Sequence, residues 1–332
     1  MRTSAAQAES RALIVGCAGQ DGTLLSARLR TAGVDVWGVR ADGSVVHDGV
    51  AVTGAAIHDA AAVAALVGRV VPDAIYYLAA HHHSAEQAPS PQAELWRKSF
   101  AVHCEGLVNV LEGVFAAAPR AHVVYASSSH VFGEPTTTPQ DESTPLAPLS
   151  PYAVTKAAGM GICAAYRRRG VRASSAILFN HESHLRPRHF VVQRVAYAVA
   201  AAALTRQRTV LIELGDPEAV VDWSSADDVV QAMAGIADLD AGDDFVIASG
   251  IARTVRELCA VAAAHAGLDV EVVTRADLGV RRMPPLVGNS ARLHARLALP
   301  PPVPFARWVG SLVDSARDAL TDAGASGSRE AS

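Results

Sequence analysis

The chain has 332 residues, half of them apolar, and a formal net charge of −4 at pH 7. This length is enough for one large domain or two unequal ones, each with a substantial core. The slightly acidic balance gives no broad basic field, so nucleic acid and acidic membranes are not favoured partners. A small molecule is the expected ligand.

The cysteines and the apolar runs bear on the compartment in which the protein works. Cys17, Cys104, Cys163 and Cys259 show neither the paired spacing of zinc ligands nor the density of a disulfide scaffold, so we expect buried thiols and no metal. The start of the chain carries no apolar run typical of a signal peptide, and the longest apolar stretch, 195–204, is too short to span a bilayer. We therefore expect a cytoplasmic protein.

Short apolar runs alternate with segments of helical periodicity over the first half of the chain. The expected strands are 11–16, 34–40, 73–79, 122–128 and 172–180, and the expected helices are 23–32, 60–70, 92–118 and 152–169. This alternation predicts an α/β protein with a Rossmann-type, doubly wound parallel sheet.

After residue 180 the pattern changes to His- and Arg-rich loops and a Pro-rich end, which predicts a smaller C-terminal substrate-binding lobe. We assign 11–178 to a dinucleotide-binding domain, 179–322 mainly to the second lobe, and 1–10 and 323–332 to disordered termini. Part of 215–255 is expected to return to the sheet.

A glycine-rich segment, GCAGQDG, follows the first expected strand and opens the first helix. Gly16, Gly19 and Gly22 allow a tight turn and let a pyrophosphate approach the helix N-terminus. Gln20 and Asp21 belong to the same segment, so we place them at the cofactor as well.

The end of the second expected strand bears on the choice of dinucleotide. It ends at Arg40 rather than at an acidic residue, which favours the 2′-phosphate of NADP over the free ribose of NAD. Asp42 lies close by and keeps NAD as the alternative.

The strongest chemical signal is a serine run, 127–129, at the end of a strand, followed by a Tyr-x-x-x-Lys motif at the start of a helix. Tyr152 and Lys156 are four residues apart and lie on one helical face, so the ammonium can lower the phenol pKa and make the tyrosine a base. The hydroxyl of Ser128 is placed to hold a substrate oxygen. An isolated motif of this kind is usually an exposed helix, but its order after the glycine-rich turn favours catalysis.

With these motifs the chain resembles the extended short-chain dehydrogenases, and within them the GDP-mannose 4,6-dehydratase family. The resemblance extends over GCAGQDGTLL (16–25), YYLAA (76–80), ASSSHVFGE (126–134), SPYAVTK (150–156), ILFNHES (177–183), DWSSADDVV (222–230) and DDFVIASG (243–250). It implies a tightly held NADP, a nucleoside-diphosphate sugar in the cleft between the lobes, and a homodimer formed through helices.

The resemblance also assigns roles by position. Tyr152 and Lys156 match the family's catalytic pair, and Ser128 takes the place of its threonine. Asn180 matches an asparagine near the sugar diphosphate, and Arg194 falls near a basic position that faces the nucleotide. The YYLAA stretch at the end of the 73–79 strand implies cofactor contacts from Leu78, Ala79 and Ala80.

Three positions depart from the family pattern. His130 stands where the dehydratases have a glutamate that helps remove the C5 proton, and a histidine can also move protons near neutral pH. Val221 replaces a phosphate-binding arginine, a charge that Arg282 or its neighbour could supply. Ala56 replaces an aspartate that contacts adenine.

A run of three histidines follows the 73–79 strand. Adjacent side chains on an extended segment point in alternating directions, and no acidic or cysteine cluster stands nearby, so we do not expect a metal site. A solvated polar turn is the plain alternative. We expect His82, His83 and Ser84, together with Ser129, to line the sugar pocket.

The expected function is a nucleotide-sugar 4,6-dehydratase that works through a 4-keto intermediate and recycles its NADP(H). Without the glutamate, the same machinery fits an epimerase, a 4-ketoreductase, or a dehydratase that leaves an unsaturated sugar nucleotide. A non-catalytic cofactor sensor is a further alternative, but it predicts a broken Tyr/Lys pair, and both residues are present.

Overall fold

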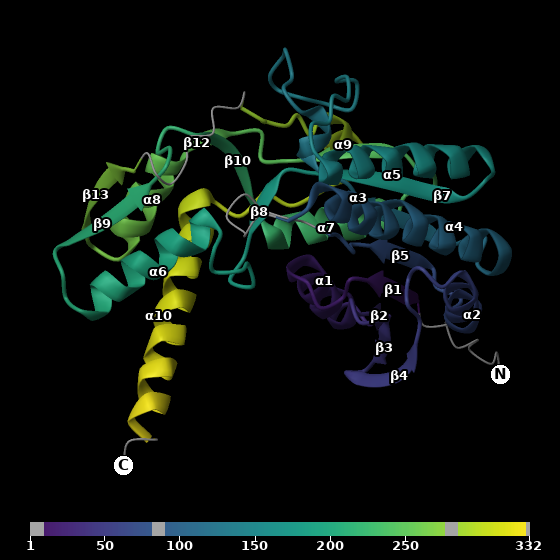
Figure 1. Cartoon of the computed structure of the whole chain (residues 1–332), viewed down its shortest axis with the longest axis horizontal. Helices are drawn as coiled ribbons and strands as arrows, with labels where there is room; N and C mark the ends of the chain where they lie inside the picture. Colours follow the sequence, from purple (N-terminus) through teal and green to yellow (C-terminus); the bar gives the residue numbers. More distant parts are fainter. Residues whose placement is uncertain (1–9, 82–89, 276–284, 330–332) are drawn as a thin grey trace, which may run out of the picture.

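An eight-stranded sheet forms the centre of the computed structural model, which describes residues 10–81, 90–275 and 285–329 (Figure 1). In spatial order its strands are β11 (Asp244–Ile247), β7 (Arg172–Leu178), β6 (His122–Ala126), β5 (Ala74–Tyr77), β1 (Arg11–Val15), β2 (Asp35–Val39), β3 (Ser44–His47) and β4 (Val50–Gly54). Neighbours from β11 to β2 pair in parallel. The chain reverses its direction of progress between β1 and β5, which confirms the predicted doubly wound α/β class.

Helices cover both faces of this sheet. One face carries α1 (Gln20–Thr31) and α7 (Ala226–Ala237), and the other carries α2 (Ala60–Val70), α4 (Gly106–Ala117) and α5 (Pro151–Arg168). Because both faces are buried, the central strands are nearly continuous apolar runs rather than alternating ones.

The helical segment that runs along the α2 and α5 side is interrupted. A π-helical turn, η1 (Ala101–Glu105), separates α3 (Gln92–Phe100) from α4. By length and composition alone the segment Gln92–Ala117 could cross a membrane, but a core helix passes the same test. Leu107, Leu111 and Val114 on α4 are fully buried against α2 and the sheet.

The second lobe has its own core. Its strands are β8 (Asn180–Glu182), β9 (Thr209–Leu214), β10 (Val220–Ser225), β12 (Ala252–Thr254) and β13 (Asp269–Thr274), and its helices are α6 (Val191–Leu204), α8 (Val255–His265) and α10 (Phe305–Arg329). Buried Trp223, Leu258, Trp308 and Leu312 join these elements. The short helix α9 (Ala291–Arg296) instead packs against β11 of the large sheet.

Two features differ from the expectations. The sequence did not indicate β3 and β4, whose antiparallel hairpin adds to the sheet edge, because β4 is fully exposed and has no apolar face to bury. Helix α10 continues to Arg329, past residue 322, where we expected the second lobe to end. The first half of α10 packs into the second lobe through Trp308, Leu312 and Ala316, so the later turns extend a helix that is already nucleated.

Candidate active site

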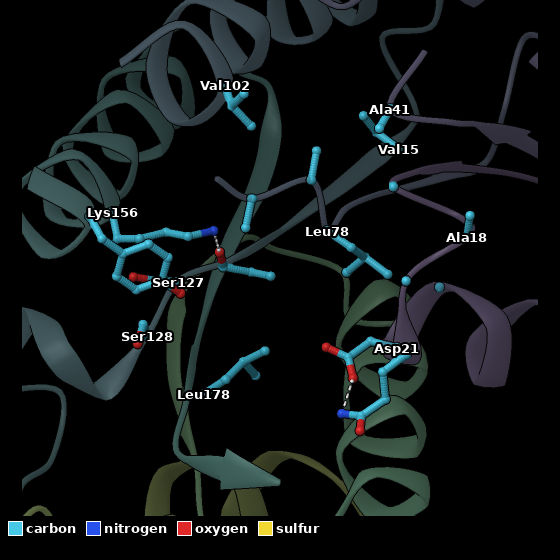
Figure 2. A pocket seen from close by; sticks show the side chains of 18 of the residues that line it. Val15, Ala18, Asp21, Ala41, Leu78, Val102, Ser127, Ser128, Lys156 and Leu178 are labelled. Atoms are coloured by element: carbon cyan, nitrogen blue, oxygen red, sulfur yellow. Dashed lines mark hydrogen bonds between the residues drawn. The ribbon is translucent and has the colours of Figure 1, made fainter. Parts of the chain in front are cut away.

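A cavity of about 730 Å³ opens at the carboxyl ends of β1, β2, β5, β6 and β7 (Figure 2). It lies at the point where the strand order reverses, which is where open α/β sheets bind ligands. The structure brings together here most of the residues singled out from the sequence. They are Gly16, Gly19, Gln20, Asp21, Gly22, Arg40, Leu78, Ala79, Ala80, Ser128, Ser129, His130, Tyr152, Lys156 and Asn180.

The glycine-rich loop can form only with glycine at two positions. Gly16 has φ +93°, and a Cβ there would lie 2.8 Å from the backbone nitrogen of Ala79. A Cβ on Gly22 would lie 2.4 Å from the carbonyl oxygen of Gly16. The loop therefore folds tightly against the end of β5 and directs the N-terminus of α1 into the cavity, where its free N–H groups suit a phosphate.

The side chains of Gln20 and Asp21 bind protein groups across the cavity. His181 Nε2 donates to Asp21 Oδ1 at 3.0 Å, while its Nδ1 donates to the carbonyl oxygen of Phe179 at 2.7 Å. Gln20 Oε1 accepts from both the backbone and the hydroxyl of Ser183. These bonds join α1 to β8, so α1 and the second lobe are held in fixed relative positions.

Asp21 and His181 stabilise each other in their charged forms. Burial by itself would raise the pKa of Asp21, but the charge and hydrogen bond of His181 outweigh it and hold that pKa at about 2. Burial likewise would lower the pKa of His181, and Asp21 reverses the shift and raises it. Imidazolium and carboxylate therefore form a buried ion pair in the cavity wall.

The other end of the cavity is lined by residues that follow β2 and β4. Arg40 lies at its rim and is exposed. The carboxylate of Asp42 accepts hydrogen bonds from the backbone and hydroxyl of Ser44 at 2.8 and 2.7 Å, and these bonds lower its pKa. Asp42 is thus engaged in the turn before β3, and Arg40 is the charged side chain that this end offers to a ligand.

Tyr152 and Lys156 sit in the first turns of α5. The hydroxyl of Ser150 accepts from the N–H of Ala153 and caps this helix. Lys156 Nζ donates to the carbonyl oxygen of Ala126 at 2.6 Å (Figure 2) and lies 5.8 Å from the centre of the Tyr152 ring. Burial lowers the pKa of Lys156 to about 7, with the negative charge of Asp21 opposing the shift.

The phenol of Tyr152 is harder to ionise than the sequence suggested. Burial raises its pKa, while a hydrogen bond with Ser128 and the positive charge of Arg186 act in the opposite direction. The expectation that Lys156 lowers this pKa is not reflected in the structure, because the ammonium is turned to a main-chain carbonyl. A phenolate at this position therefore depends on Ser128 and on positive charge within the cavity.

Three residues after β6 face Tyr152 from the same wall. Ser128 caps the short helix η2 (Ser129–Phe132) by accepting from the N–H of His130. The ring of His130 meets that of Tyr152 edge-on, with 6.0 Å between the centroids. The buried hydroxyl of Ser127 has no protein hydrogen-bond partner and lines the cavity (Figure 2).

The loop between β8 and α6 supplies cavity residues that the sequence analysis missed. Leu185, Arg186, His189 and Phe190 line the cavity, and the guanidinium of Arg186 lies 3.9 Å from the Phe190 ring centroid. The signal was the cluster of His and Arg directly after ILFNHES, which we had interpreted as an undefined loop. The guanidinium of Arg186 places a positive charge in the cavity wall.

Some predicted site residues do not reach the cavity or cannot be placed. Arg194 lies on α6 and donates to the carbonyl oxygen of Glu213, away from the residues that line the cavity. The remaining substrate residues, His82, His83, Ser84 and Arg282, lie outside the described residues. Within residues 10–81, 90–275 and 285–329, no group of three or more His, Cys, Asp or Glu side chains could hold a metal ion.

The residues present fit a dinucleotide. The glycine-rich loop leaves room for backbone approach that a Cβ would fill, α1 presents its N-terminus, and Ser127 offers an unpaired hydroxyl deep in the same cavity. Lys156 lines the same cavity, and Figure 2 shows its ammonium beside Ser127. One cavity therefore holds a tyrosine, serine hydroxyls and a glycine-rich loop at a helix N-terminus.

Comparisons with known proteins agree with this geometry. Among solved structures, a putative epimerase from Burkholderia cenocepacia superposes with a TM-score of 0.80 at 26% identity, over 93% of this chain and 98% of that one. Two further structures share the fold. RMD from Pseudomonas aeruginosa, complexed with NADPH, has a TM-score of 0.74 at 22% identity, over 93% of this chain and 99% of that one. dTDP-glucose 4,6-dehydratase from Bacillus anthracis, in complex with NAD, has a TM-score of 0.73 at 18% identity, over 92% of this chain and 96% of that one.

Relatives found by sequence identify the family, whereas the more distant solved structures show only the fold. GDP-mannose 4,6 dehydratase 2 of Caenorhabditis elegans is 34% identical over 77% of this chain and 70% of its own length. GDP-mannose 4,6-dehydratase of Yersinia enterocolitica is 32% identical over 79% and 73%. Residues 13–291 match the family described as GDP-mannose 4,6 dehydratase. The chain belongs to the GDP-mannose 4,6-dehydratase family, an NAD(P)-dependent branch of the Rossmann-fold dehydrogenases and epimerases.

Proposed function

We propose that the protein converts a nucleoside-diphosphate hexose to its 4-keto-6-deoxy derivative, with NADP as the cofactor. The observation that carries this proposal is the convergence of Tyr152, Ser128 and His130 on one wall of a cavity whose opposite end is a phosphate cradle. Family membership and the relatives' names support the same reaction.

The chain's residues divide the proton transfers of this reaction. Tyr152 Oη takes the proton of the C4 hydroxyl, while the hydroxyl of Ser128 holds the same oxygen. NADP, which the glycine-rich loop and Arg40 would hold, would supply the hydride chemistry between C4 and C6. The new C4 carbonyl acidifies the C5 proton, which the His130 imidazole removes and passes to the departing C6 hydroxyl, so that water leaves. When hydride is added at C6, C5 takes up a proton, and the proton that Tyr152 took from the C4 hydroxyl balances it.

The basic loop after β8 is suited to the diphosphate. Arg186 and His189 line the cavity beside Asn180, and a planar guanidinium fits phosphate oxygens.

The four cysteines are free, which fits a reducing compartment, and we assign the protein to the cytoplasm.

Substitution of Tyr152 tests the proposed reaction. Tyr152→Phe keeps the ring but removes the base, so we expect turnover of GDP-mannose and related nucleotide sugars to fall by about 10²- to 10⁴-fold, with NADP still bound. Product formation is followed by NMR and cofactor binding by fluorescence. Tyr166→Phe, on the far end of α5 where the hydroxyl binds Glu112, is the matched control and should stay active. Wild-type rates in Tyr152→Phe would refute the assignment.

His130 decides whether chemistry continues past the 4-ketone. In His130→Ala we expect oxidation at C4 to persist while deuterium exchange at C5 in D₂O and release of water fall by about 10²-fold or more. His130→Glu restores a carboxylate base and should recover dehydration. If His130→Ala still forms the 6-deoxy product at the wild-type rate, the residue has no part in dehydration.

The replaced glutamate also favours a second candidate, a nucleotide-sugar epimerase. In that reaction hydride returns to the other face of C4 and no water is lost, so the same NMR assay separates the two. A product with an inverted C4 and an intact C6 hydroxyl from the wild-type enzyme would establish the second candidate.

Arg40 tests the choice of NADP over NAD. Its loss removes a charge-assisted hydrogen bond to a 2′-phosphate, worth about 1.5 to 3 kcal/mol, so Arg40→Ala should weaken NADP binding by about 10- to 100-fold and leave NAD binding nearly unchanged. Titration calorimetry with both dinucleotides measures this. Arg30→Ala, an exposed arginine near the end of α1, is the control. Equal losses for both dinucleotides would contradict the assignment.

We also propose that the protein is a homodimer formed through α3 and α4. Trp96, Phe100 and Phe115 on this helical segment are 42%, 57% and 47% exposed, and aromatic side chains of this size are typical of interfaces. Two copies of the same face would meet around a twofold axis.

Phe100→Glu tests the interface, because a buried unpaired carboxylate is costly in a dimer contact. Light scattering after size exclusion should show a shift from dimer to monomer mass. Leu211→Glu, an equally exposed apolar position on β9, should leave the mass unchanged. A monomeric wild type, or a dimer that survives Phe100→Glu, would exclude this interface.

A further inference from the structure

A buried histidine lies behind the catalytic tyrosine and is not part of the cavity lining. His103 is fully buried and belongs to the π-helical turn η1 between α3 and α4. Its ring meets the Tyr152 ring edge-on, with 5.3 Å between centroids and an interplanar angle of 87°. Single π-helical turns inside α-helices occur frequently at functional sites, and this one turns His103 toward the first turn of α5.

Hydrogen bonds define the tautomer of His103. The backbone N–H of His81 donates to its Nε2 at 3.0 Å, so this nitrogen carries a lone pair. Nδ1 then carries the proton and donates to Thr155 Oγ1 at 2.7 Å. The Thr155 hydroxyl in turn donates to the carbonyl oxygen of Pro151 at 2.7 Å. The imidazole is therefore neutral, and its orientation is fixed because Nε2 accepts a hydrogen bond while Nδ1 donates one.

These bonds connect two parts of the active site that are far apart in sequence. His81 follows Leu78, Ala79 and Ala80, the segment after β5 that lines the cavity. Thr155 lies in the first turn of α5, between Tyr152 and Lys156. His103 thus joins the cavity-lining segment to the turn that carries the base, and its ring packs against the phenol itself.

We propose that His103 is a positioning residue that fixes the Tyr152 phenol relative to the segment 78–81. The inference rests on the proposed role of Tyr152 as the base. His103 contacts neither substrate nor cofactor in this account. It acts by holding the first turn of α5 through Thr155 and by filling the space behind the ring, so that the phenol meets the C4 hydroxyl in one orientation.

Substitution should separate this role from general stability. His103→Ala is expected to lower kcat by about 10- to 100-fold, while the substrate KM and the Kd for NADP change by less than about twofold. The control is His122→Ala, which removes an equally buried histidine that binds Ser174 and Leu239 on the far side of the sheet. It should lower the unfolding temperature without lowering kcat of the folded enzyme.

Conservative variants identify the bond that matters. His103→Asn can place a donor near the former Nδ1 and keep the Thr155 contact, so it should recover most of the kcat lost in His103→Ala. Thr155→Val should reproduce the loss and Thr155→Ser should not. If His103→Ala retains wild-type kcat, the positioning role is overturned. The same holds if kcat falls as much in the His122→Ala control as in His103→Ala.

One measurement needs no substrate and so separates this inference from the proposed function. Ultraviolet titration of the NADP-bound protein, taken as the difference from the matching Tyr152→Phe variant, isolates ionisation of the Tyr152 phenol. His103→Ala should move its midpoint and His122→Ala should not. An unmoved midpoint refutes the positioning role, whereas a moved midpoint in a protein that forms no 4-keto sugar refutes only the proposed function.

Discussion

The packing of α5 against β6 is the constraint on which the active site depends. Lys156 is 1% exposed, and its ammonium is held by the carbonyl oxygen of Ala126 and lies 5.0 Å from the Tyr125 ring centroid. Gly159 permits this closeness, because a Cβ there would lie 2.3 Å from the Tyr125 hydroxyl. An ammonium taken out of water is costly unless it is well bonded, so helix and strand have little freedom to move apart.

Other contacts extend this fixed frame across the cavity. The ion pair between Asp21 and His181 ties α1 to β8, and the main-chain N–H groups of Ser249, Gly250 and Gly288 donate to the fully buried carboxylate of Asp222. Each contact links segments more than twenty residues apart. The second lobe is therefore joined to the sheet by buried polar bonds as well as by apolar packing, which suits a cleft that must align a sugar with a cofactor.

Three histidines lie in or around this frame, each with different partners. His130 stands where the family has a glutamate, and His103 and His181 are buried with both ring nitrogens engaged. These three rings have different surroundings, since His181 is paired with the carboxylate of Asp21, His103 is bonded to a backbone N–H and a hydroxyl, and His130 lines the cavity edge-on to Tyr152. The same residue type is thus divided between structure and chemistry by its hydrogen-bond partners.

The sequence by itself determined the sheet, the glycine-rich loop and the Tyr152/Lys156 pair, because buried parallel strands are continuous apolar runs and these motifs are local. It did not indicate β3, a short strand with two buried valines, or β4, whose residues are all exposed, or the continuation of α10. Only the tertiary structure decided that Lys156 turns to Ala126, that Arg194 points away from the cavity, and that His103 and Arg186 belong to the site. Those outcomes depend on contacts between distant segments, and no local pattern encodes which partner a buried donor will find.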